Sequence, residues 1–303
     1  MTLQDKLRSN RFVITAEVTP PVSADGAEFL AKALPLKGLA DAVNVTDGAG
    51  ARPHLGAVTS AAMLVEQGIE PILQLTCRDR NRIALQSDLL SAAACGVRNI
   101  LALRGDDPSA GDQPEAKPVF DLDPRSLLNT ARRLRDSGEL PTGRKVTGSA
   151  DFFLGSADNP IDPAPGWQPT GLQAKIEAGA QFVQTQFCMD AGVMRRYLAR
   201  LTEAGVTGKL SFIIGVVPLR SAKSARWIKE KLFGAVIPDA LIERMERATD
   251  PGGEGRKICI DVVRELADVP HVAGVHIMAP GNDSAVPDVI KAARESIKRL
   301  AAV

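Results

Sequence analysis

Polar residues follow several apolar segments of this chain, and their types suit proton transfer and ligand binding. The clearest case is Arg104-Gly105-Asp106, which closes the apolar run at residues 99–103. The arginine supplies a cation, the glycine permits close backbone approach and the aspartate supplies a carboxylate. Glu17 has a similar position, because it lies in an apolar segment that ends in two prolines. Such residues at strand ends are typical of the catalytic face of an α/β barrel.

Glu17 and Asp106 are candidates for different tasks. Burial of Glu17 in an apolar strand would favour its neutral form, so that it donates a proton near neutral pH. The alternative is a buried acid held by an arginine or by backbone amides. Arg104 and the flexible Gly105 would keep Asp106 ionised and let it approach a ring that carries N–H groups. The alternative for Asp106 is a salt bridge with Arg104.

The segments that must position these residues alternate between strand and helix patterns. They predict the α/β class, as a parallel (β/α)8 TIM barrel in a single catalytic domain over residues 1–303, with a doubly wound open sheet as the alternative. The expected strands are residues 11–18, 42–46, 71–76, 99–103, 152–156, 181–187, 210–217 and 274–278. The expected helices are residues 24–40, 55–67, 82–95, 124–137 and 171–178, with three more within 222–267. Long loops at 107–123 and 157–170 either cover a ligand or are tolerated surface insertions.

Composition excludes several classes of function. The 37 Lys and Arg residues nearly balance 36 Asp and Glu, so the net charge of +1 favours no nucleic acid or anionic membrane as partner. No signal-peptide pattern or membrane-length apolar run is present, which predicts a cytoplasmic protein. The four cysteines are scattered, so reduced and mostly buried thiols are expected. The three histidines form no spaced pair with a carboxylate or with each other, which predicts no metal site.

Five motifs, taken in order, resemble those of methylenetetrahydrofolate reductases. They lie at residues 16–21, 45–48, 74–77, 103–106 and 185–187, and the resemblance runs from Phe12 to about Ile297. It implies a (β/α)8 flavoprotein that uses FAD to pass a hydride to or from the one-carbon unit of a tetrahydrofolate derivative. The reaction interconverts 5,10-methylenetetrahydrofolate and 5-methyltetrahydrofolate, within one-carbon metabolism and methionine biosynthesis. The family is commonly homo-oligomeric.

The same resemblance assigns roles to individual residues. Glu17 resembles the general acid that protonates folate N10, Asp106 the carboxylate that meets the pterin and tunes the flavin, and Gln186 the amide that orients the folate. Glu17, Asp106 and Gln186 are therefore the expected folate-binding residues. The expected FAD contacts are Thr46, Gln74, Leu103, Arg104, Gly105, Asp106, Gly155 and Lys175.

The chain also departs from the family pattern. Gln74 stands where many members carry a histidine, and an amide cannot become a cation. After residues 217–218 the bacterial pattern has a phenylalanine that stacks on NADH, whereas this chain has Leu219 and, further on, Ala222. Further departures fall at Gln168, Gly171 and residues 281–283. These changes leave NAD(P)H or another electron carrier open as the redox partner, and they favour the hypothesis of poor NADH use and of methyl-folate oxidation.

Two other classes of function compete with this interpretation. One is a metal-dependent barrel aldolase or hydrolase with Glu17 and Asp106 as ligands. The other is a non-catalytic partner subunit of a reductase complex that no longer binds FAD. The joint presence of Glu17, Asp106 and Gln186 argues against the second.

Overall fold

A computed structural model describes residues 1–300 of the chain, with side chains through residue 298. Eight parallel strands form a closed barrel in sequence order. The strands are β1 (Val13–Val18), β2 (Val43–Val45), β3 (Pro71–Thr76), β4 (Asn99–Leu103), β5 (Phe153–Asp158), β6 (Phe182–Phe187), β7 (Ser211–Val216) and β8 (Val272–Ile277). Because β1 pairs with both β2 and β8, the sheet has no open edge. The predicted barrel is confirmed, and the open-sheet alternative is wrong.

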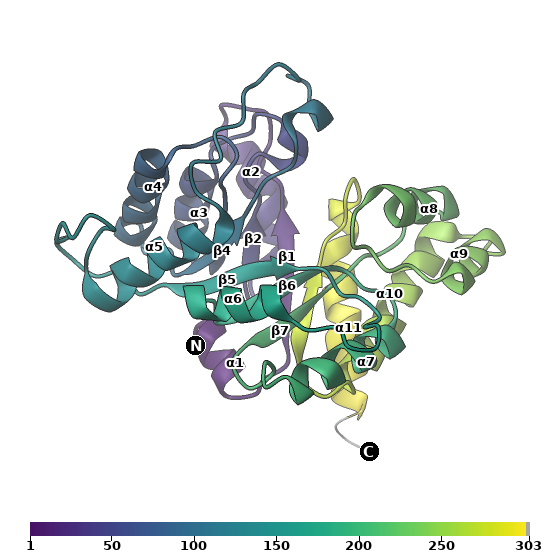
Figure 1. The fold of residues 1–303 in the computed structure, drawn as a ribbon. Coiled ribbons are helices and arrows are strands. Elements are labelled where there is room, and N and C mark those ends of the chain that lie inside the picture. The colour runs from purple at the N-terminus through teal and green to yellow at the C-terminus, as the bar shows by residue number, and fades with distance from the viewer. Residues whose placement is uncertain (301–303) are drawn as a thin grey trace.

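Helices surround this barrel (Figure 1). They are α1 (Leu3–Arg8), α2 (Gly26–Ala33), α3 (Ala57–Glu66), α4 (Arg82–Ala94), α5 (Pro124–Ser137), α6 (Thr170–Ala178), α7 (Ala191–Glu203), α8 (Ala222–Lys231), α9 (Asp239–Glu246), α10 (Pro251–Ala267) and α11 (Val286–Leu300). Short 3-10 turns occur at η1 (Leu34–Leu36), η2 (Ala49–Ala51), η3 (Pro108–Ala110) and η4 (Asp283–Ala285). No helix among residues 1–300 is both long and apolar enough to span a membrane.

Most expected elements are confirmed, with differences at their ends. The three helices expected within residues 222–267 are α8, α9 and α10. The helix expected at 24–40 ends at Ala33, because Pro35 cannot continue the α-helical hydrogen bonds and the chain passes into η1. β5 runs on to Asp158, so the loop expected to begin at residue 157 begins after that aspartate. Helices α1, α7 and α11 were not predicted from the sequence.

The inside of the barrel is apolar at the end where the strands begin. Helix α1 places Leu3 and Leu7 against this end, and a capping box between Thr2 and Asp5 fixes its first turn. The rings of Phe153 and Phe182 stack above them, with centroids 4.8 Å apart. Together Leu3, Leu7, Phe153 and Phe182 form an apolar plug at this end of the barrel. The polar interior positions lie at the opposite end, where the strands finish. All four cysteines lack disulfide partners, and three of them are buried, as expected.

One buried carboxylate ties the ends of the chain to the barrel. Asp41 accepts hydrogen bonds from the backbone of Ile14 at 2.8 Å and from Arg294 of α11 at 2.6 Å. Lys6 of α1 lies 3.0 Å from its other oxygen. Burial acts to raise the pKa of Asp41, but the bonds from Ile14, Arg294 and Lys6 outweigh it and lower that pKa. Asp41 is therefore held as a carboxylate at neutral pH.

Candidate active site

A layer of polar side chains crosses the barrel above the apolar plug. Asn44 and Gln184 exchange two amide hydrogen bonds, of 2.6 and 3.1 Å. Gln184 also donates to Thr15 at 3.3 Å, and the hydroxyl of Thr15 lies 2.9 Å from Nδ1 of His276. All four residues are buried. Because their polar atoms satisfy one another, the layer forms a fixed floor beneath the residues at the strand ends.

Glu17 stands directly above this floor. Its Oε2 accepts a hydrogen bond of 3.0 Å from the amide of Gln74, and Nε2 of His276 lies 3.7 Å from the same oxygen. The glutamate side chain is 22% exposed, so it is partly desolvated but open to the barrel mouth. No arginine or backbone amide among the described residues binds this carboxylate, so the alternative of an acid held by such groups is not observed. The structure therefore joins Glu17 to a histidine, which the sequence analysis did not expect.

A second acid lies near Glu17 at the end of the last strand. Asp283 begins η4, in the segment that follows β8. Burial raises its pKa, Lys32 acts to lower it and the charge of Glu17 raises it further. Because the charge of Glu17 raises the pKa of Asp283, the two carboxyl groups interact electrostatically at the barrel mouth.

The tip of β4 has an unusual backbone shape. Gly105 has a φ of +93°, and a Cβ atom there would lie 2.9 Å from Cβ of Arg78 and 3.2 Å from Cβ of Thr76. Asp106 turns its carboxylate toward the amide of Gly50, at 3.0 Å, while its carbonyl accepts from the buried Arg78 at 3.2 Å. The glycine therefore permits both the turn and the close packing at this tip.

Arg104 does not pair with Asp106. Its guanidinium lies over the ring of Phe120, 4.4 Å from the centroid, and no acid among the described residues forms an ion pair with it. This contact draws the loop that follows β4 over the strand tip. The salt bridge proposed between Arg104 and Asp106 is absent from the described residues, so the Asp106 carboxylate is held by backbone instead. Leu103, half-buried, ends the strand below them.

Gln186 extends from β6 toward the same end of the barrel. Its Oε1 accepts a hydrogen bond of 3.0 Å from the backbone of Phe187, which fixes the orientation of the amide. Its NH2 group has no acceptor among the described residues. A half-buried amide held in this way presents two N–H donors to a ligand.

Lys175 is a residue of α6, and its side chain reaches the end of β5 instead of extending into solvent. Its ammonium donates to the carbonyl of Ala157 at 2.7 Å and stands 3.7 Å from Asp158. Asp158 in turn accepts a bond of 2.5 Å from the hydroxyl of Tyr197. Burial raises the pKa of Asp158, whereas Lys175 and Tyr197 act to lower it. The ammonium of Lys175 is therefore held in place by the mostly buried Asp158 and by the carbonyl of Ala157.

Two further predicted residues have distinct surroundings. Thr46, just after β2, is 5% exposed, and its hydroxyl has no hydrogen-bond partner among the described residues. Gly155 lies within β5, where a Cβ atom would fall 2.2 Å from the ring of Phe182. The structure therefore gives Gly155 a packing role in the barrel, one layer below the mouth. An orphaned buried hydroxyl such as that of Thr46 fits a position where a ligand completes the bonding.

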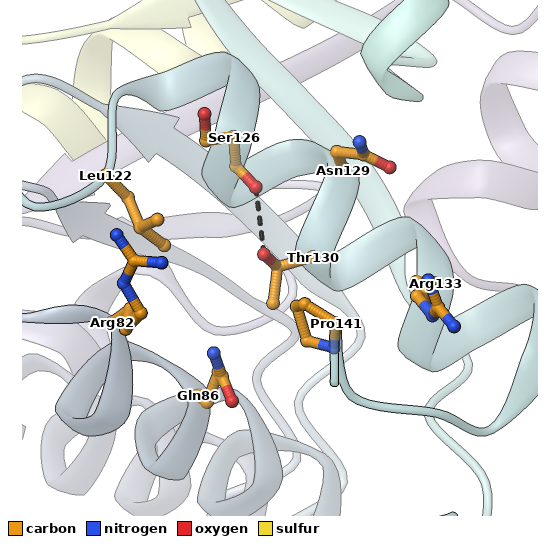
Figure 2. A pocket seen from close by; sticks show the side chains of 8 residues that line it. All are labelled: Arg82, Gln86, Leu122, Ser126, Asn129, Thr130, Arg133 and Pro141. Atoms are coloured by element: carbon orange, nitrogen blue, oxygen red, sulfur yellow. Dashed lines mark hydrogen bonds between the residues drawn. The ribbon is translucent and has the colours of Figure 1, made fainter. Parts of the chain in front are cut away.

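Other parts of the molecule fit the chemistry less well. A cavity of about 250 Å³ between α4 and α5 has two arginines in its wall (Figure 2). Arg82 pairs with Asp121 and Arg133 with Glu139, so both charges are already compensated. Within residues 1–300 no cluster of three His, Cys, Asp or Glu side chains could hold a metal ion. The ligand set that a metal-dependent aldolase needs is therefore not assembled by Glu17 and Asp106.

The polar floor beneath the site was not predicted from the sequence. Asn44, Gln184 and His276 are polar residues at strand positions that face the barrel interior. A buried amide or imidazole in such a place needs a partner, and the neighbouring strands supply it. A polar residue at an interior strand position was therefore the feature of the sequence that could have indicated this layer. The sequence alone does not show which of these side chains meet.

The closed parallel barrel with polar side chains at the carboxyl ends of its strands places the chain among the (β/α)8 barrel proteins. The family model of methylenetetrahydrofolate reductase matches residues 2–294. The chain belongs to the methylenetetrahydrofolate reductase family, as the motifs indicated.

Several curated relatives carry the same name. The chain is 27% identical to a probable methylenetetrahydrofolate reductase (NADPH) of Caenorhabditis elegans, over 77% of this chain and 33% of the relative. It is 25% identical to methylenetetrahydrofolate reductase 2 of Schizosaccharomyces pombe, over 95% of this chain and 46% of the relative. It is 28% identical to the 5,10-methylenetetrahydrofolate reductase of Escherichia coli, over 66% and 62%. The matched region thus spans between a third and two thirds of each relative.

A solved structure supports the fold. An uncharacterized protein from Clostridium thermocellum, which binds two copies of 5-methyl-5,6,7,8-tetrahydrofolic acid, superposes with a TM-score of 0.66 at 14% identity. The match covers 97% of this chain and 98% of that protein. At this identity the likeness shows a shared architecture.

Proposed function

We propose that this protein interconverts 5,10-methylenetetrahydrofolate and 5-methyltetrahydrofolate by hydride transfer through FAD. The observation that carries the proposal is Glu17, a partly desolvated carboxyl group at the barrel mouth with Gln74 and His276 on one oxygen. Family membership supports the reaction, and a structural neighbour that binds a methyl-folate supports the substrate class. The matching metabolic role is methyl-folate supply or consumption in one-carbon metabolism, including methionine biosynthesis.

The residues at the mouth fit a flavin nucleotide. Thr46 offers a buried hydroxyl without a partner, and Gly105 lets the backbone at the β4 tip approach a ring closely. Arg104 at the tip of β4 and Lys175 near the end of β5 supply positive charge, which suits the pyrophosphate. Leu103, Asp106 and Gln74 complete the expected set, whereas Gly155 contributes through packing against Phe182. When bound, FAD supplies the two-electron carrier between the redox partner and the folate.

Glu17 is the proposed general acid. In the reductive direction its proton passes to N10 of the folate, the bond from N10 to the methylene carbon breaks, and N5 carries the resulting iminium. That carbon then accepts the hydride and becomes the methyl group. In the oxidative direction the same carboxylate takes the proton back as the ring closes. His276 and Thr15 connect this carboxyl to the polar floor of the barrel.

Gln186 and Asp106 are the proposed folate anchors. The fixed amide of Gln186 presents N–H donors, which suit the carbonyl and ring nitrogens of a pterin edge. Asp106 presents a carboxylate, which accepts from the pterin N–H groups. Because the Gly50 amide already holds one Asp106 oxygen at 3.0 Å, the other oxygen is the one available to the ligand.

The proposed redox partner follows from a departure at the start of α8. Ala222, half-buried, carries only a methyl group and offers no ring-stacking surface where the family pattern has a phenylalanine. We therefore propose that NADH reduces the flavin slowly and that the methyl-folate reduces it efficiently. The proposed redox partner is NAD(P)H or another electron carrier. Stopped-flow mixing tests this, since rapid flavin reduction by micromolar NADH contradicts the proposal. The protein is proposed to be a homo-oligomeric, cytoplasmic enzyme.

An absorbance spectrum tests the function itself. Purified protein reconstituted with FAD is expected to be yellow, and anaerobic addition of 5-methyltetrahydrofolate is expected to bleach the flavin band. A colourless protein that FAD does not reconstitute contradicts the proposal and favours the non-catalytic subunit. A yellow protein that no folate bleaches would contradict the folate assignment while leaving the cofactor assignment in place.

A further inference from the structure

A basic cleft lies at the N-terminal end of the barrel, opposite the candidate active site. Two adjoining cavities, of about 740 and 520 Å³, run beside α1. Gln4, Arg8, Phe153 and Gln181 line both, so the cavities meet at α1 and the starts of β5 and β6. Each volume is in the range of pockets that bind small molecules.

Positive charge is concentrated in this cleft. Arg11 and Lys209 line the larger cavity, Arg98 lines the smaller one, and Arg8 stands where they meet. None of these four cations forms an ion pair with any side chain of residues 1–298. Among the described residues that line the two cavities, Asp151 is the single carboxylate, and it lines the smaller cavity. In a chain of net charge +1, so many uncompensated cations in one hollow create a local field that attracts anions.

The walls also offer an apolar surface and a hydrogen-bond acceptor. Phe12, half-buried, lines the larger cavity, and Phe153, which is buried against Phe182, borders both cavities. In the wall of the smaller cavity, Asn99 is 1% exposed. Its Nδ2 donates hydrogen bonds to Glu70 at 3.0 Å and to the carbonyl of Pro71 at 2.8 Å, whereas its Oδ1 has no partner among the described residues. These two acceptors fix the amide orientation, because a flipped oxygen would face a carboxylate. The free acceptor needs an N–H or O–H donor from a ligand or a water.

The geometry points to a binding site for a nucleoside phosphate in this cleft. Arginines and a lysine match the phosphate oxygens, the half-buried ring of Phe12 matches the flat base, and the acceptor of Asn99 matches an amino group on that base. The site is separate from the candidate active site, because the cleft and the barrel mouth lie at opposite ends of the strands. The inference therefore does not depend on the proposed reaction.

Calorimetric titration with ADP tests the site, using protein saturated with FAD so that the barrel mouth is occupied. We expect one ADP per chain, with adenosine and inorganic pyrophosphate each binding at least about tenfold more weakly. The double variant Arg8→Gln/Arg98→Gln is expected to raise the Kd for ADP at least about tenfold. Both arginines are exposed, so the variant keeps the fold, and unchanged circular dichroism confirms this.

The matched control is Arg52→Gln/Arg256→Gln, which changes the net charge equally at two exposed arginines elsewhere and is expected to bind ADP normally. Absence of ADP binding at millimolar concentration overturns the inference, as does equal weakening in both double variants. Release of FAD by ADP also overturns it, because ADP would then occupy the barrel mouth. If the protein binds no FAD, the same titration without FAD still tests the cleft through the two double variants.

Discussion

Glu17 has one engaged oxygen and one available oxygen. Gln74 and His276 both approach Oε2, whereas Oε1 has no partner among residues 1–298. A carboxyl group held on one side keeps its orientation and can present a proton from the other side. The amide of Gln74 donates whatever the state of the acid, so the substitution of the family histidine leaves this contact intact. At the residue scale, the site is therefore a positioned acid with ligand-facing amides.

Gln186→Glu tests the proposed folate anchor. The carboxylate still accepts from the backbone of Phe187, so the local structure is retained, but both N–H donors are lost. We expect the KM for 5-methyltetrahydrofolate to rise about tenfold, the effect of losing a hydrogen bond and leaving a ligand acceptor unpaired. FAD affinity should not change. Gln173→Glu, on the exposed face of α6, serves as the control; an unchanged KM in Gln186→Glu would remove this anchor from the account.

At the scale of single elements, the tip of β4 depends on its glycine. Gly105→Ala places a Cβ atom 2.9 Å from Arg78 and also strains a backbone of positive φ. We expect a loss of about 2 kcal/mol in the free energy of unfolding, together with weaker FAD binding. Gly143→Ala is the matched control, because Gly143 has a φ of +86° with no atom within 4 Å. Urea titration of both variants separates crowding from backbone strain, and equal losses would contradict the role of close packing.

The end of β5 holds the cation proposed for the pyrophosphate. Lys175→Ala should raise the Kd for FAD about tenfold or more, since a bond between charged groups contributes about 1.5–3 kcal/mol. It also leaves buried Asp158 without its counter-ion. Fluorescence titration with FAD measures the effect, with Lys37→Ala on the exposed surface as control. If Lys175→Ala bound FAD like the wild type, Lys175 would serve the structure alone.

Periodicity predicted the strands well because each strand carries its own apolar signal. The positions of Glu17, Asp106 and Gln186 at strand ends followed from the same signal. The contact between Glu17 and His276 did not, because it depends on the closure of β8 against β1 from opposite ends of the chain. The role of Gly155 was equally hidden, since only the ring of Phe182 on the neighbouring strand requires a glycine there. Local patterns predict elements, whereas such pairs require the assembled barrel.

At the scale of the whole molecule, Asp41 joins α1, β1 and α11. Its pKa is lowered in the folded state, so its contribution to stability is complete above its unfolded value, near 3.8, and is lost as the pH falls through the folded value. Asp41→Asn should reduce the free energy of unfolding at pH 7 by about 3 kcal/mol, because it leaves two half-buried cations, Lys6 and Arg294, without their partner. The difference from the wild type should shrink below about pH 4.

Urea unfolding at pH 7 and at pH 3.5 measures that prediction. Asp112→Asn, in the exposed loop that follows β4, is the control and should match the wild type at both pH values. A difference that is equally large at both pH values would mean that Asp41 acts through shape rather than charge.

The central claim is that Glu17 delivers the proton at the barrel mouth, and a single-turnover measurement tests it most directly. Protein loaded with FAD and reduced anaerobically is mixed with 5,10-methylenetetrahydrofolate, and flavin reoxidation is followed. We expect Glu17→Gln to slow this step by about a hundredfold or more with unchanged FAD affinity, and Glu28→Gln, on the exposed side of α2, to react normally. A Glu17→Gln rate equal to that of the wild type would contradict the account.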